Sequence, residues 1–224
     1  MLRRFLLSTA ILLCASTAQA ITIVSVTGPN QFGNIGQAYL GNQYPSVGFS
    51  TASDYVNVSI SVSLIGGSID SAVTLGAFLT TQVGPGTTAA NEIASSTQQV
   101  SVAASPAFPL QITEVTVLTG LTLPAGAYYL TLEGSGTPEI PSWANSLDVN
   151  LTATFDAGAA IAFGYLFGPT LFPPSYHPAA VVSQSNGRTL WFNVTGDPAN
   201  VPEPASLTML AGGLALACLY SRRK

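Results

Sequence analysis

Basic residues are almost absent from this 224-residue chain outside its two ends. Between residues 21 and 200 there is no lysine and one arginine, Arg188, against nine carboxylates, a net charge of −8 with histidine neutral. Proteins that bind DNA or RNA place clusters of lysine and arginine against the phosphates. The composition therefore excludes a nucleic-acid partner for the middle of the chain.

Cysteine and histidine are equally scarce. Cys14 and Cys218 lie in the apolar runs at the two ends, so the middle of the chain has neither a disulfide framework nor a thiolate metal site. Leu13 precedes Cys14, where lipoprotein processing would require a small residue. His177 is the only histidine, and the chain has neither a G-x-S-x-G motif nor a D-x-D-x-D-G calcium loop.

The acidic residues also give no catalytic pattern. A glycosidase needs two carboxylates on either side of the scissile bond, and the spacing of the nine carboxylates singles out no pair. We therefore expect no enzymatic activity, no cofactor and no metal. A glycosidase or a polysaccharide lyase is the less favoured enzymatic alternative.

What the chain does contain at its start is a three-part export signal. Arg3 and Arg4 precede an apolar stretch from Phe5 to Ala15, and Ala18 and Ala20 form a small-x-small cleavage site. These are the parts of a secretory signal peptide. We predict export of the chain and cleavage after Ala20.

The other end has an uncharged run from Ala205 to Tyr220, followed by Arg222, Arg223 and Lys224. As a helix the run would be roughly 24 Å long at about 1.5 Å per residue, slightly short of a ~30 Å hydrocarbon core. A bilayer can thin to match it, and the basic residues would remain in the cytoplasm. We predict one transmembrane helix here, with a buried helix of the soluble domain as the alternative.

Val201, Pro202, Glu203 and Pro204 stand directly before this run. A Pro-Glu-Pro triplet, an apolar span and a terminal basic cluster, in this order, resemble the PEP-CTERM sorting signal of exported bacterial proteins. The resemblance implies processing near the triplet by an exosortase, a membrane protease or transpeptidase of Gram-negative bacteria that also make extracellular polysaccharide. It further implies a precursor anchored in the inner membrane, whose product reaches the cell surface or the extracellular matrix. A plain stalk before a permanent anchor is the alternative.

The middle of the chain is rich in alternating strands. Residues 55–64, YVNVSISVSL, place Val56, Val58, Ile60, Val62 and Leu64 on one face, which indicates a half-buried antiparallel strand. Comparable runs occur at 21–26, 73–80, 111–118, 127–134, 147–154, 159–167 and 189–196. Residues 86–99 are expected to form a loop, with a short helix as the alternative. Many short strands without a clear amphipathic helix predict an all-β fold, an antiparallel β-sandwich of jelly-roll type.

The chain is thus predicted to have four parts. Residues 1–20 are the signal peptide and 21–196 the β-sandwich ectodomain. Residues 197–206 form a linker with the Pro-Glu-Pro motif, and 207–224 form the transmembrane sorting segment with its basic tail.

Aromatic residues gather in the last third of the chain. Trp143 and Tyr176 lie in proline-flanked segments and are expected to be exposed, and exposed Trp and Tyr side chains can stack on sugar rings. The favoured function is an exported, non-catalytic structural or adhesive protein of the envelope or exopolysaccharide matrix. A carbohydrate-binding module with Trp143 and Tyr176 as glycan contacts is the alternative.

Overall fold

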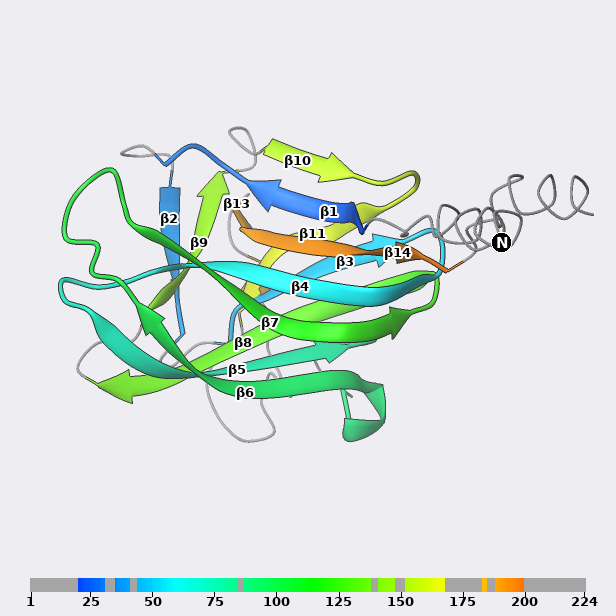
Figure 1. Cartoon of the computed structure of the whole chain (residues 1–224), viewed down its shortest axis with the longest axis horizontal. Helices are drawn as coiled ribbons and strands as arrows, with labels where there is room; N and C mark the ends of the chain where they lie inside the picture. Colours follow the sequence, from blue (N-terminus) through cyan, green and yellow to red (C-terminus); the bar gives the residue numbers. More distant parts are fainter. Residues whose placement is uncertain are drawn as a thin grey trace, which may run out of the picture. The chain divides into compact units, whose positions relative to one another are not determined.

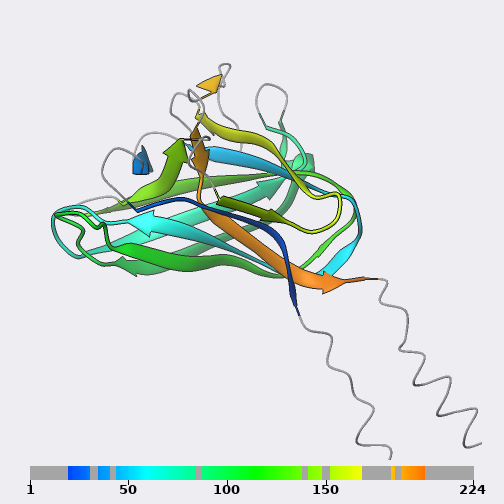
Figure 2. The same cartoon turned by 90° about the horizontal axis from the view of Figure 1, so that it is seen from above.

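Two antiparallel β-sheets face each other in the computed structural model (Figure 1, Figure 2). The structure describes residues 20–30, 35–40, 44–83, 87–137, 141–147, 152–167, 183–184 and 188–199. Within these ranges the elements are strands and one short 3-10 turn, and residues 20–197 form one compact unit. The prediction of an all-β fold with two packed sheets is confirmed.

The first sheet has the order β10 (Thr152–Phe155), β1 (Ile21–Thr27), β14 (Phe192–Pro198), β4 (Tyr55–Ile65), β9 (Ser142–Leu147) and β13 (Arg188–Leu190). In addition, β2 (Ile35–Tyr39) pairs with β9, and β7 (Ile112–Leu123) pairs with β4. The second sheet has the order β12 (Ser183–Gln184), β11 (Ala160–Phe167), β3 (Ser46–Thr51), β8 (Gly126–Thr137), β5 (Ser71–Thr80) and β6 (Glu92–Val102).

The strand pairs are nested along the chain. β5 pairs with β6, β4 with β7, β3 with β8, β2 with β9 and β1 with β10, each pair antiparallel. The segment up to β5 therefore folds back along the segment that follows it. The last strand, β14, then takes a place between β1 and β4, in the interior of the first sheet.

Strand β4 follows the predicted alternation with one correction. Val58, Ile60, Val62 and Leu64 are all fully buried, as predicted, but Val56 is only half-buried and Tyr55 takes the interior position instead. The cause is Asn57, which has a φ of 53° and lies where the β4–β7 register shifts. A bulge adds one residue to a strand and so reverses the alternation on one side of it.

The expectation of a loop at 86–99 is wrong for most of that segment. A 3-10 turn, Ala89–Asn91, leads directly into the edge strand β6. From Glu92 to Gln99 its residues alternate only between half-buried and exposed. Most of these side chains are polar and they occupy both faces, so no apolar period marks the strand in the sequence. Hydrogen bonds fix it instead, including one of 2.6 Å from Gln99 Nε2 to Thr74 Oγ1 on β5.

The core lies between the two sheets and contains residues of both. At its centre the Phe49 ring, on β3, lies 5.6 Å from Tyr128 on β8 and 5.8 Å from Phe192 on β14, centroid to centroid. Burying one side chain of this kind contributes about 1.5–3 kcal/mol. The core therefore holds β14 against the opposite sheet as well as within its own.

Candidate functional site

Most residues of the predicted sorting signal lie outside the described part of the chain. This holds for the transmembrane segment and for every residue of the sorting motif and the basic tail: Val201, Pro202, Glu203, Pro204, Arg222, Arg223 and Lys224. It also holds for Ala18 of the cleavage site and for Tyr176. In the ranges that the structure does describe, we find no apolar helix of membrane-spanning length.

The two ends of the ectodomain meet at one end of the sheets. Ile21, the residue after the predicted cleavage site, pairs with Gly196 on the neighbouring strand β14. Ala20 is exposed, as a cleavage site must be. Gly196 is buried, and a Cβ there would lie 2.8 Å from Val58 Cγ2, so glycine permits the close packing of β14 on β4. The segment that leads to the sorting motif therefore leaves the fold beside the predicted signal-peptide cut.

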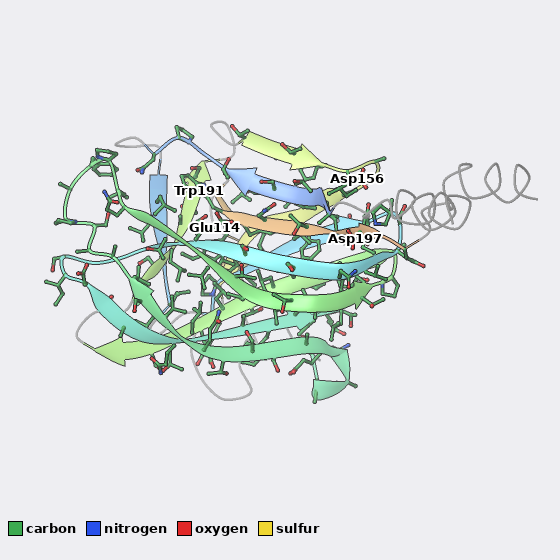
Figure 3. The ribbon with its side chains drawn as sticks, viewed as in Figure 1. Glu114, Asp156, Trp191 and Asp197 are labelled. Carbon is green, nitrogen blue, oxygen red and sulfur yellow. The ribbon has the colours of Figure 1, made fainter. Side chains whose placement is uncertain are left out.

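Asp197 is the second-to-last residue of β14, and Figure 3 shows it near the end of that strand. Asn57 Nδ2 donates a hydrogen bond of 2.9 Å to Asp197 Oδ2. The second carboxylate oxygen, Oδ1, is buried and has no hydrogen-bond partner among the described residues. The Asn57 bulge places an amide against the carboxylate, and asparagine is one of the few residues that tolerate a positive φ.

A second carboxylate, Asp156, is held at the turn between β10 and β11 (Figure 3). Its backbone nitrogen donates 2.9 Å to the Ile23 carbonyl, and the Tyr55 hydroxyl donates to its Oδ2. Burial raises the pKa of Tyr55 to about 12, and the hydrogen bond to Asp156 and its negative charge act in the same direction. Because Tyr55 keeps its proton, it joins β4 to the β10–β11 turn as a hydrogen-bond donor.

This Tyr55 contact predicts a specific dependence of stability on pH. Below pH 10 the Tyr55 hydroxyl keeps its proton in both states, so its contribution to stability is fully present. Between pH 10.0 and about 12 the unfolded chain loses this proton while the folded chain keeps it, so the contribution falls as the pH rises. Urea unfolding of wild type and Tyr55→Phe should show the wild-type advantage shrinking across that window. A constant difference between the two proteins would contradict the assignment.

Trp143, predicted to be exposed, is fully buried, and this prediction is wrong. The residue lies within β9, and its Nε1 donates 2.7 Å to the Trp191 carbonyl. Trp191, shown in Figure 3 and 4% exposed, in turn donates from Nε1 to Ser146 Oγ at 3.0 Å. The proline before β9 marked a strand start rather than an exposed loop. Trp143 is therefore unable to stack on a sugar ring.

A polar cavity is lined in part by β5 and β8 of the second sheet. Its volume is about 220 Å³, and its lining includes Tyr44, Thr74, Gly76, Glu133 and Ser135. A Cβ at Gly76 would lie 2.7 Å from Glu133 Oε1, so this glycine leaves room for the carboxylate side chain to lie across the strand. No local pattern in the sequence marks these residues as a site, because they come together only through the β5–β8 pairing of Gly76 with Glu133.

We also searched the described ranges for side chains that could bind a metal ion. We find there no group of three or more His, Cys, Asp or Glu side chains that could hold an ion.

Comparison with known proteins gives one assignment. No curated protein matches the chain. Among solved structures, a chain of the T13 IBDV viral particle is similar at 12% identity and a TM-score of 0.31, over 86% of this chain and 42% of that one. This chain thus spans less than half the length of that relative.

The family model described as PEP-CTERM protein-sorting motif matches residues 200–224. The recognition made from the sequence is confirmed: the chain carries a PEP-CTERM sorting motif at its C-terminus, which implies export, a membrane-anchored precursor and processing by an exosortase.

Proposed function

We propose that this protein is an exported, non-catalytic component of the envelope or exopolysaccharide matrix of a Gram-negative bacterium, with a structural or adhesive role. One observation carries the proposal: a compact all-β unit ends at Asp197, and the sorting motif begins three residues later. The folded unit is the cargo, and residues 200–224 are the signal that delivers it. Residues 1–20 act as the signal peptide and 207–224 as the membrane segment.

The fold supports a jelly-roll class for this cargo. Jelly rolls are double-sheet structures built from antiparallel Greek keys, which protect most sheet edges. The nested pairing from β5–β6 outward to β1–β10 is the order such a fold requires.

The outer surface of the fold supports a polysaccharide partner. Along the edge strand β6 the exposed positions include Ser95, Thr97, Gln99 and Ser101. Hydroxyl and amide groups exchange hydrogen bonds with sugar hydroxyls and do not depend on charge. A surface of this kind suits residence in a hydrated exopolysaccharide matrix. The narrower prediction of a glycan-binding site at Tyr176 stays a prediction.

The test of the sorting function is Glu203→Ala. This variant should accumulate as full-length precursor in the membrane fraction, because the Pro-Glu-Pro triplet loses its only charged side chain. Glu114→Ala is the matched control, since Glu114 is an exposed carboxylate on β7 far from the tail in sequence. Immunoblots of membrane and extracellular fractions measure both. Processing of the Glu203 variant at the wild-type rate would reduce the triplet to a stalk.

A further inference from the structure

The bond between Asp197 and Pro198 has a special place in the chain. It is the only Asp-Pro peptide bond in the sequence. It also coincides with the boundary of the compact unit, which ends at Asp197. Breaking it would separate the whole ectodomain from the whole sorting signal, and no other single bond with this chemistry would do so.

An Asp-Pro bond is intrinsically prone to cleavage by its own side chain. The aspartate carboxyl can reach the carbonyl carbon of its own residue and close a five-membered ring, and such intramolecular attack has a very high effective concentration. The proline nitrogen belongs to a tertiary amide, whose resonance is easier to disturb, and it leaves as a basic secondary amine.

Two features of the fold act on the Asp197 carboxyl group. Asn57 Nδ2 binds Oδ2 at 2.9 Å and so restricts rotation of the carboxyl group. Oδ1 is buried and has no hydrogen-bond partner among the described residues, so it is not stabilised by solvation as a surface carboxylate oxygen is. A buried polar atom without a partner is uncommon in folded proteins and needs an explanation. We explain the missing partner of Oδ1 by its role as the attacking oxygen, which a hydrogen bond would make less reactive.

We propose that the protein cleaves itself between Asp197 and Pro198. The Asp197 carboxyl oxygen attacks its own backbone carbonyl carbon and forms a C–O bond, while the C–N bond to Pro198 breaks. The carboxyl proton passes to the proline nitrogen, which leaves as a secondary amine, and Asp197 is left as a cyclic anhydride. One water molecule then opens the anhydride to two carboxyl groups. The net reaction is hydrolysis of one peptide bond, with water as the only co-reactant.

The products would differ from those of the sorting enzyme. Self-cleavage gives an ectodomain that ends at Asp197 and a fragment that begins at Pro198 and keeps the entire Pro-Glu-Pro motif. Exosortase processing near Pro202–Pro204 gives a longer ectodomain. Self-cleavage would thus release the β-sandwich without the enzyme, and its failure would leave the sorting proposal untouched.

The experiment follows the full chain, purified in detergent from a host without an exosortase, by intact mass spectrometry in mildly acidic buffer. We expect the two fragments that meet at Asp197–Pro198. Asp197→Ala should abolish them. Asn57→Gly, which keeps the positive φ but removes the amide, should slow their appearance by about tenfold. Pro198→Ala keeps the Asn57 contact to the carboxyl group and should also slow the reaction, because it supplies a poorer leaving group.

The decisive comparison is with the same chain unfolded in urea at the same pH. Faster cleavage in the folded chain supports the proposal, because only the fold brings Asn57 to Asp197. Cleavage at an equal or lower rate in the folded chain, or fragments that persist in Asp197→Ala, would overturn it.

Discussion

Replacing Trp143 with alanine is expected to lower the free energy of unfolding by about 3–5 kcal/mol, as deletion of a buried aromatic side chain usually does. The side chain is fully buried, and its removal would leave a cavity in the core between the two sheets. It would also remove one of the two hydrogen bonds that the Trp191 carbonyl accepts, since Trp143 Nε1 and the Ser63 backbone N–H both donate to it. Urea unfolding followed by circular dichroism measures the loss.

Phe155→Ala is the matched control for this prediction. Phe155 is also an aromatic residue on a strand of the first sheet, but it is 41% exposed on the edge strand β10. Its loss should lower the free energy of unfolding by less than about 1 kcal/mol. Similar losses in the two variants would mean that Trp143 is not a core residue, and would restore it as a candidate glycan contact.

The sequence predicts those strands in which apolar and polar residues alternate. β1, β4, β5, β7 and β8 all appear where the pattern placed them, because one face of each packs in the core and tolerates only apolar side chains. β6 was missed for the complementary reason. Over most of its length neither face packs deeply in the core, so its sequence shows little alternation of apolar and polar residues.

The errors at Val56 and Trp143 have a different origin. Alternation assumes a regular strand, and the bulge at Asn57 breaks that assumption through one backbone angle. For Trp143, a nearby proline is compatible with a loop and with the first residues of a strand. Only the pairing of β9 with β2, β4 and β13 decides between them, and strand pairing is a long-range property of the chain.

The candidate site also has one part that the sequence predicts and one part that it does not. The sorting motif is a short contiguous segment, so its residues carry the whole signal and the sequence alone identified it. The Asn57–Asp197 contact joins residues 140 positions apart. No local pattern could have indicated it, because it depends on where β14 enters the sheet.

A chain that stops after Leu190 is expected not to fold, whereas one that stops after Asn200 should be as stable as the intact ectodomain. The shorter chain lacks β14, which lies between β1 and β4. It loses Phe192, 2% exposed, and Val194, fully buried, each of which contributes about 1.5–3 kcal/mol. With the hydrogen bonds on both sides of β14, the loss approaches the ~5–15 kcal/mol that stabilises a typical domain. Circular dichroism and urea unfolding of chains beginning at Ile21 measure the difference.

The same comparison tests whether both proposed cuts come after the last part of the chain that the fold needs. Gly196 is the last buried residue among those described, and both proposed cuts, at Asp197–Pro198 and near Pro202–Pro204, come after it. The cut near Pro202–Pro204 leaves β14 whole, and the cut at Asp197–Pro198 removes only its last residue, so the released ectodomain should unfold at the same urea concentration as its precursor. Cooperative unfolding of the chain that stops after Leu190 would show that β14 is dispensable. The position of the sorting motif just beyond β14 would then have no structural reason.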